Sequence, residues 1–247
     1  MEQKADGHRI LVYKHGDDKV FGISRSGKPL SLSKEILAVL QDLPVSFILD
    51  GELIRIETGV YTLVLFDILR LEHQDLRDIA FKDRKALLQT LLPENRHPVY
   101  VMQTVWSPLE KQPVYDYLEA NGAEGVIFKH RSAKYVAGRP PETGVMWFRK
   151  KWTAVATVQV VRQDPTKRAV FYRYADTGEI GSVAQYPNRP LAQPNDLLEC
   201  SYLYADTVSQ SLIQPVCKRI RTDVSGPDHS SSLQYKAAAR WPAGGSK

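Results

Sequence analysis

The sequence has little cysteine, no long apolar run and no apolar signal core, and each absence argues against a class of protein. Its 247 residues include two cysteines, Cys200 and Cys217, too few for a disulfide-rich scaffold and without the spacing of a zinc site. We interpret them as buried, reduced thiols rather than a disulfide. No apolar run approaches the roughly 18 residues that cross a bilayer, and the first seven residues are rich in charge. We therefore expect a cytoplasmic protein that does not contact membranes.

Positive charge is the one compositional excess. The sequence has 33 lysines and arginines against 28 acidic residues, which gives a net charge of +5 and a pI near 9.1. Clustered cations gain free energy by displacing counterions from phosphates, so the balance indicates a polyanionic partner. The hydrophobic fraction of 43% and the charged fraction of 25% are ordinary for a globular protein.

The pattern of predicted secondary structure changes near Trp152. The first part mixes short strands with helices that we expect at residues 33–40, 81–92 and 113–121. The second part repeats short β-rich segments between turn residues, which favours a small closed barrel of the OB type; we expect its strands at 157–161, 169–174, 180–184 and 197–204. From Ser225 the chain is rich in serine, glycine and alanine, which predicts flexibility. The predicted fold class is α+β, with domains at 1–151 and 152–224 and a flexible tail at 225–247.

The segment Lys4–Arg9 combines a lysine, a glycine and an arginine in six residues. A lysine attacks phosphorus only as the neutral amine, so its pKa must fall below the free value of about 10.4. Nearby cations can supply that shift. Arg9 is suited to a forked contact with phosphate or ribose, and Gly7 lets the backbone approach a ligand. On its own, the segment could equally be a surface lysine in a turn.

Five further segments place charged or aromatic residues beside predicted strands. They are Ser24–Gly27, Asp50–Glu52, Phe66–Asp67, Glu124–Lys129 and Arg149–Lys151. Each has an ordinary structural alternative: a turn for Asp-Gly, a core position for the phenylalanine, a solvated edge strand for the cations. Taken in order with Lys4–Arg9, they resemble the six-part signature of covalent nucleotidyltransferases, which include DNA ligases, RNA ligases and mRNA capping enzymes.

The sequence between these motifs is similar to ATP-dependent DNA ligases, above all to the ligase domains of bacterial end-joining enzymes. The similarity spans residues 2–224 and includes Asp75–Arg77, Arg84–Leu88, Lys134–Arg139, Leu198–Leu203 and Arg221–Asp223. It implies a nucleotidyltransferase domain of antiparallel sheets with flanking helices, followed by an OB domain.

The resemblance also implies a reaction and a set of site residues. Lys4 would attack the α-phosphate of ATP and carry AMP, which would pass to the 5′-phosphate of a nick before the 3′-hydroxyl displaces it. Magnesium, for which manganese may substitute, would bind Glu52 and Glu124. The residues implied to bind ATP are Glu2 at the adenine amino group, Phe66 by stacking, and Arg9, Arg25, Glu52, Arg149 and Lys151 at ribose or phosphate. Arg221 and Asp223 would form motif VI in a mobile OB domain.

The implied partner is nicked double-stranded DNA, bound by a monomer. Ligases accept any sequence, so the contacts should be to phosphates. The candidates are Lys129, His130, Arg131, Lys134, Arg139, Lys218 and Arg219. The alternative for this set is a solvated basic surface.

Three departures from the family pattern leave alternatives open. Arg149 stands where a lysine is usual, Val224 stands where motif VI usually ends in lysine, and only three residues precede Lys4, whereas family members carry a segment there that helps to wall the adenine pocket. The chain is therefore expected to be either a reduced enzyme or a truncated one. The competing functions are an RNA ligase or other RNA-directed nucleotidyltransferase, and a catalytically weak nick-binding protein.

Overall fold

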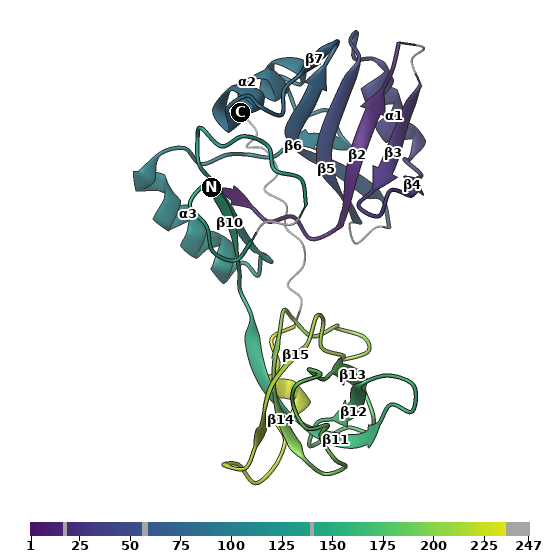
Figure 1. Ribbon diagram of the computed structural model, residues 1–247, viewed down its shortest axis with the longest axis vertical. Coiled ribbons are helices and arrows are strands. Elements are labelled where there is room, and N and C mark those ends of the chain that lie inside the picture. The colour runs from purple at the N-terminus through teal and green to yellow at the C-terminus, as the bar shows by residue number, and fades with distance from the viewer. Residues whose placement is uncertain (17–18, 56–58, 139–140, 236–247) are drawn as a thin grey trace. The chain divides into compact units, whose positions relative to one another are not determined.

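The computed structural model describes residues 1–16, 19–55, 59–138 and 141–235. The chain forms two compact units, one comprising Met1–Lys150 and the other beginning at Lys151 (Figure 1). Within the described residues, no helix has the length and apolar character needed to span a bilayer. Each unit is described in turn.

The first unit is built on a large sheet, which has seven strands within the described residues, in the order β4-β3-β2-β5-β6-β7, with β8 beside β6. All neighbours are antiparallel except β6 and β8, which are parallel. The strands are β2 (His8–Lys14), β3 (Val20–Ser24), β4 (Pro29–Leu30), β5 (Phe47–Arg55), β6 (Tyr61–Leu71), β7 (Gln74–Asp75) and β8 (Val99–Val101).

One face of this sheet packs against two helices, α1 (Lys34–Gln41) and α2 (Phe81–Leu91). Strand periodicity sends alternate residues to opposite faces, so Ile10 and Val12 of β2 enter this core. They pack with other fully buried side chains, including Ile36, Leu40, Leu49, Ile68 and Leu88. The opposite face of the same strands is left to carry polar residues.

A β-bulge on β6 directs Phe66 to that opposite face. Asp50 of β5 pairs with Asp67, and the next residue, Gly51, pairs with Leu65, so Phe66 is an extra residue without a cross-strand partner. Bulges re-aim side chains and are frequent beside active sites. The half-buried ring packs against a small apolar cluster of Ala5, Ile54, Val64 and Met102.

The same unit contains a smaller sheet in the order β1-β9-β10, formed by β1 (Glu2–Gln3), β9 (Gly125–Lys129) and β10 (Trp147–Lys151). Glu2 pairs with Ile127 and Gln3 with Val126, in antiparallel register. This register ties the start of the chain to a strand more than 120 residues later.

Helix α3 (Pro108–Ala120) begins five residues before the position predicted from the sequence. The prediction took Pro113 as the helix start, because proline is tolerated best in the first turn. The structure instead has Pro108 in the first turn after Ser107 and accommodates Pro113 inside the helix. The helices predicted at 33–40 and 81–92 agree with α1 and α2 to within a residue.

Two consecutive buried cations join α2 to both sheets. Arg84 donates from Nε and Nη2 to the two carboxylate oxygens of Asp67 on β6, at 2.7 and 2.9 Å. Lys85 donates to Oε1 of Glu2 on β1 at 3.0 Å. These four side chains are almost fully inaccessible to solvent. Because Asp67 belongs to the large sheet and Glu2 to the small one, α2 connects the two sheets through charge.

The second unit is a sheet in the order β13-β12-β11-β14-β15, antiparallel throughout. Its strands are β11 (Ala154–Gln163), β12 (Ala169–Arg173), β13 (Gly181–Ala184), β14 (Leu197–Tyr202) and β15 (Val216–Arg221). The four strands predicted after Trp152 are present. The fifth, β15, was not predicted, because its run Lys218–Ile220 is exposed and lacks the alternation of a half-buried strand.

The flexible tail predicted from Ser225 is wrong for residues 225–235. Ser230 is buried and donates through its backbone N–H to Asp176 at 2.8 Å, at the start of the short 3₁₀ helix Ser230–Ser232. Leu233 enters the core of the second unit. Composition suggested flexibility, but these two contacts and the hydrogen bonds that Asp228 and Gln234 make with the second unit hold the segment in place. The remainder of the predicted tail, 236–247, lies outside the described residues.

We predict that Arg84→Met destabilises the first unit by about 3–5 kcal/mol, because it leaves the buried carboxylate of Asp67 without its cation. Urea denaturation followed by circular dichroism measures the loss. Arg77→Met is the control, since Arg77 forms an exposed ion pair with Asp75 and its removal should change stability little. Equal stability of the two variants would contradict the inferred role of the buried pair.

Candidate active site

Lys4 follows β1 and lies against the residue that precedes β9. Its backbone N–H donates to the carbonyl of Gly125 at 2.8 Å, which continues the β1–β9 pairing. Its Nζ forms an ion pair with Oε2 of Glu124, whose side chain is only 2% exposed. The lysine side chain itself is 23% exposed. Strand register therefore brings a partly accessible amine against a buried carboxylate.

Glu52 of β5 supplies a second carboxylate beside Lys4. It pairs in register with Arg9 of β2. Burial, together with the negative charge of Glu124 and against the attraction of Lys4, raises the pKa of Glu52 to about 7. A β-carbon on Gly7 would lie 2.4 Å from the backbone oxygen of Leu53, so only glycine permits this close approach of the two strands.

Arg9 is held in a fixed orientation by Asp50 and Tyr135. Its Nε and Nη2 donate to the two oxygens of Asp50 at 3.1 and 2.7 Å, and Nη2 also donates to the Tyr135 hydroxyl at 3.0 Å. That hydroxyl donates to Asp50 at 2.8 Å. Burial opposes the charge of Arg9, but hydrogen bonding to Asp50 outweighs it and raises the pKa of Arg9. Arg9 is therefore an immobilised cation.

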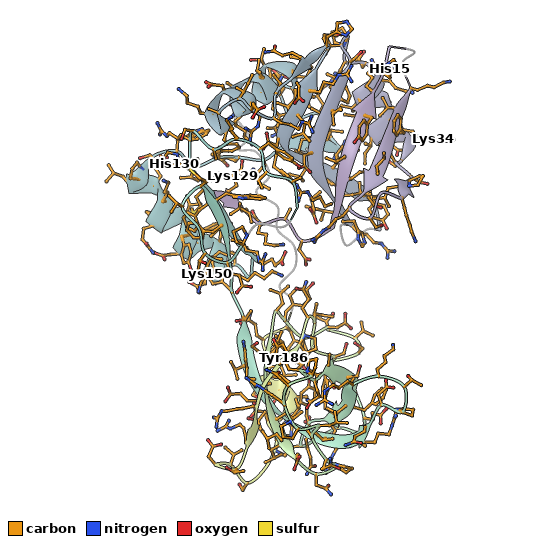
Figure 2. All side chains as sticks on the ribbon, viewed as in Figure 1. His15, Lys34, Lys129, His130, Lys150 and Tyr186 are labelled. Atoms are coloured by element: carbon orange, nitrogen blue, oxygen red, sulfur yellow. The ribbon has the colours of Figure 1, made fainter. Side chains whose placement is uncertain are left out.

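Lys129 of β9 lies between two aromatic rings and a buried carboxylate. Its Nζ is 5.1 Å from the centroid of the Phe66 ring and 4.5 Å from that of Phe81. It also forms an ion pair with Oε2 of Glu2 at 2.8 Å. Figure 2 shows Lys129 close to the N-terminal strand. With its side chain only 10% exposed and bound by Glu2, Lys129 is better placed for the interior of the site than for the DNA contact predicted from the sequence.

Glu2 is surrounded by donors. Oε1 accepts from Lys85 at 3.0 Å and from the Thr104 hydroxyl at 2.7 Å, while Oε2 pairs with Lys129. Burial alone would raise the pKa of Glu2, but the positive charges of Lys129 and Lys85 outweigh it and lower the pKa to about 2. Glu2 is therefore a carboxylate at any physiological pH.

The structure thus brings together six of the residues predicted for the site, all in the first unit: Glu2, Lys4, Arg9, Glu52, Phe66 and Glu124. Arg25 lies exposed in the turn after β3. Arg149 of β10 is buried and pairs with Glu142 at 2.9 Å.

The remaining predicted residues fall into two groups: those of the second unit near its start and end, and exposed cations of either unit. Lys151 donates to the side chain of Gln214 at 2.7 Å. Arg221 pairs with Asp223 at 2.7 Å and donates to the Thr157 hydroxyl. The exposed cations are Arg131, Lys134, Lys218 and Arg219; Arg139 lies outside the described residues.

The sequence interpretation named the segments that contain these residues but gave no supporting role to Asp50 and Tyr135 around Arg9, or to Asp67, Arg84 and Lys85 around α2. One signal was available for Lys85. It lies four residues after Phe81 and three before Leu88, on the apolar stripe of an amphipathic helix. A lysine at such a position indicates a buried partner.

Part of the sequence is similar to known DNA ligases. Residues 53–151 match the family model described as the ATP dependent DNA ligase domain. A probable DNA ligase of Nocardioides sp. is 31% identical over 172 residues, covering 61% of this chain and 33% of the relative. A DNA ligase of Nanoarchaeum equitans is 34% identical over 76 residues, covering 30% of this chain and 13% of the relative. The chain spans a third or less of the length of these relatives.

Solved structures share the fold. The ligase domain of LigD from M. tuberculosis matches with a TM-score of 0.54 and 20% identity, covering 95% of this chain and 92% of that chain. A Lig E DNA ligase described as binding DNA with a minimal scaffold matches with a TM-score of 0.69 and 14% identity, covering 89% and 91%. The family model and the curated relatives confirm the resemblance to ATP-dependent DNA ligases predicted from the sequence, and the solved structures confirm a sheet-rich α+β fold.

We predict a pH-dependent effect of Glu52→Gln on stability. The pKa of Glu52 is higher in the folded protein, about 7, than its ordinary value of 4.5, so the folded state binds this proton more tightly. The resulting stabilisation is complete below pH 4.5 and is lost as the pH rises through 7. The glutamine variant has no such loss, so its free energy of unfolding should increase relative to wild type between pH 5 and pH 8. Urea denaturation at both pH values tests this; a constant difference would contradict it.

Proposed function

We propose that this chain is an ATP-dependent DNA ligase that seals nicks through AMP carried on Lys4. The observation that carries the proposal is the contact of Lys4 with Glu124 beside Glu52, in a chain whose residues 53–151 match the ATP dependent DNA ligase domain. The curated relatives, of which the chain spans about a third, are named probable DNA ligases.

In the first step, the Nζ of Lys4 attacks the α-phosphorus of ATP. A nitrogen–phosphorus bond forms, the bond to the bridging oxygen breaks, and pyrophosphate leaves. The amine must lose a proton, and Oε2 of Glu124 is already in contact with Nζ and can accept it. AMP then passes from Lys4 to the 5′-phosphate of the nick, and attack by the 3′-hydroxyl displaces AMP and joins the strand.

Glu52 and Glu124 fit a magnesium ion, for which manganese may substitute. Within the described residues, no group of three or more acidic, histidine or cysteine side chains is arranged around a metal position. Magnesium commonly uses only one or two carboxylates, with waters and substrate phosphates as the other ligands. Burial and the negative charge of Glu124 raise the pKa of Glu52, and a divalent cation would favour the charged carboxylate instead. Such an ion would neutralise developing charge on the phosphates.

Phe66, Glu2 and Lys129 fit an adenine ring. Phe66 offers an aromatic surface, and Oε2 of Glu2 lies 2.8 Å from Nζ of Lys129. Adenine presents a donor, its 6-amino group, next to an acceptor, N1. A carboxylate and an ammonium side by side complement that edge. Guanine presents an acceptor and a donor in the reverse order, so the same pair disfavours it.

The other predicted ATP contacts are Arg9, Arg25, Arg149 and Lys151, at the ribose and phosphates. Asp50 holds Arg9 in position, and Arg149 is buried on β10, next to β9, which begins directly after Glu124. Negative charge grows on phosphate oxygens in all three steps, so fixed cations supply the stabilisation.

The second unit fits an OB domain, with domain bounds at 1–151 and 152–224. Its five strands are antiparallel, and the two edge strands, β13 and β15, contact each other, as they do when a sheet closes into a barrel. Arg221 and Asp223 follow from β15 and would form motif VI. The enzyme would act as a monomer in the cytoplasm.

DNA phosphates would be contacted by the exposed cations Arg131, Lys134, Lys218 and Arg219, and by Arg139. Lys129 is left out of this proposed set because its side chain is only 10% exposed, whereas that of Lys134 is 67% exposed. The remaining side chains are long and flexible, which suits contacts that do not depend on base sequence.

The first functional test is a covalent adduct. Incubation with α-labelled ATP and magnesium should label the protein, and Lys4→Ala should abolish the label, because no other amine replaces the nucleophile. Sealing of a nicked duplex with ATP should be lost in parallel. Glu124→Ala should reduce sealing strongly while keeping its circular dichroism spectrum.

The same assay separates the alternatives. Sealing of RNA but not DNA duplexes identifies an RNA ligase. Binding of nicked DNA without an adduct identifies a nick-binding protein. Sealing that requires NAD in place of ATP contradicts the proposed donor.

We also predict that binding to nicked DNA weakens steeply with salt. Each phosphate contact that is lost should reduce the magnitude of the slope of log affinity against log salt by about one. Lys134→Ala should therefore show a slope shallower than that of wild type by about one. Lys34→Ala is the matched control. Lys34 lies on the opposite side of the first unit from His130, which belongs to the same predicted DNA-binding set as Lys134 (Figure 2). Equal slopes for the two variants would remove Lys134 from the DNA-binding surface.

A further inference from the structure

The fully buried Lys85 of α2 has no place in the reaction described above. Its Nζ donates to Oε1 of Glu2 at 3.0 Å and to the carbonyl of Met102, and its side chain is 0% exposed. A buried ammonium is costly to desolvate, and a methionine of similar volume would pack at this position with less penalty. Packing alone therefore does not explain why a lysine occupies this position.

The two oxygens of Glu2 have different surroundings. Oε1 accepts from Lys85 and from the hydroxyl of Thr104 at 2.7 Å, which come from α2 and from the segment after β8. Oε2 accepts from Lys129, the residue that lies over the Phe66 ring. A carboxylate oxygen can accept about two hydrogen bonds, so Oε1 is saturated and Oε2 has capacity for one more donor.

We infer that Lys85 is a positioning residue for nucleobase selection, which rests on the proposed use of ATP: by holding Oε1, it presents Oε2 to the 6-amino group of adenine. Glutamate has three side-chain torsions, and one contact does not fix its carboxylate. Lys85 and Thr104 hold the oxygen on the α2 side, so the remaining oxygen is held next to Lys129. Selection of adenine requires this orientation, because a carboxylate free to rotate can turn away from the acceptor O6 of guanine.

The test measures selection rather than overall activity. Adduct formation is followed against the concentration of ATP, GTP and purine riboside triphosphate, which lacks the 6-amino group. Wild type should use ATP at least about ten-fold more efficiently than the purine analogue, in kcat/KM, as expected for loss of one hydrogen bond to a charged group. In Lys85→Met this ratio should fall to about three-fold or less, and discrimination against GTP should fall with it.

Three features separate positioning from a general structural effect. In Lys85→Met, KM for ATP should rise while kcat at saturating ATP stays within about two-fold, because Lys4, Glu52 and Glu124 keep their places. Lys82→Met removes the same charge from the exposed side of α2, and should keep the wild-type ratio. Thr104→Val removes the other donor to Oε1 and should lower the ratio by a smaller factor.

The outcomes are distinguishable. A wild-type ratio in folded Lys85→Met, or an equal loss for ATP and the purine analogue, overturns the inference. If Lys85→Met does not fold, a wild-type ratio in Thr104→Val overturns it instead. If wild type forms no adduct with any nucleotide, the proposed ligase function fails, and the same ratio is then taken from equilibrium binding of the three nucleotides, which decides the role of Lys85 without chemistry.

Discussion

The ion pairs made by two consecutive residues of α2, Arg84 with Asp67 and Lys85 with Glu2, are the constraint on which the site depends. The candidate active site is divided between two sheets: Phe66, Glu52 and Arg9 belong to the large one, while Glu2, Glu124 and Lys129 lie on or beside strands of the small one. The two sheets are separate hydrogen-bonded structures. Backbone contacts link them locally, such as the bridge between Glu2 and Thr104. Helix α2 adds a rigid element that offers one cation to each sheet.

Burying ion pairs between two sheets carries a large desolvation cost, and apolar residues of similar volume often stabilise a protein as much or more. An ion pair has one property that apolar packing lacks, because it specifies a partner atom. Asp67 directly follows Phe66, so anchoring Asp67 to Arg84 locates the bulge that aims the ring. The backbone pairing of β1 with β9 already places Lys4, so anchoring Glu2 to Lys85 orients the Glu2 carboxylate rather than the strand. Each anchor thus fixes a group of the candidate site.

Sequence reasoning could identify the reacting residues but not their supports. The order of the motifs was enough to select Lys4, Glu52 and Glu124, and the structure places them together. Tyr135 and Lys85 escaped because their partners lie 85 and 83 residues away, and no local pattern encodes such a pairing. Lys129 was predicted to contact DNA because it begins a run of cations with His130 and Arg131; only the strand register reveals that it faces Glu2. The start of helix α3 was misplaced because Pro113 was taken as its first residue. Strand β15 was not predicted because its exposed run of residues lacks the alternation of a half-buried strand.

The charges around Lys4 bear on how the proposed reaction would begin. Lys4 is paired with Glu124, and burial, together with the negative charge of Glu124, raises the pKa of Glu52 to about 7. In the proposed reaction, a divalent cation would be held by Glu52 and Glu124, and Arg149 would add positive charge around the phosphates. Positive charge near Lys4 favours the neutral amine, whose proton Glu124 would accept. Binding of the substrate would thereby activate the nucleophile.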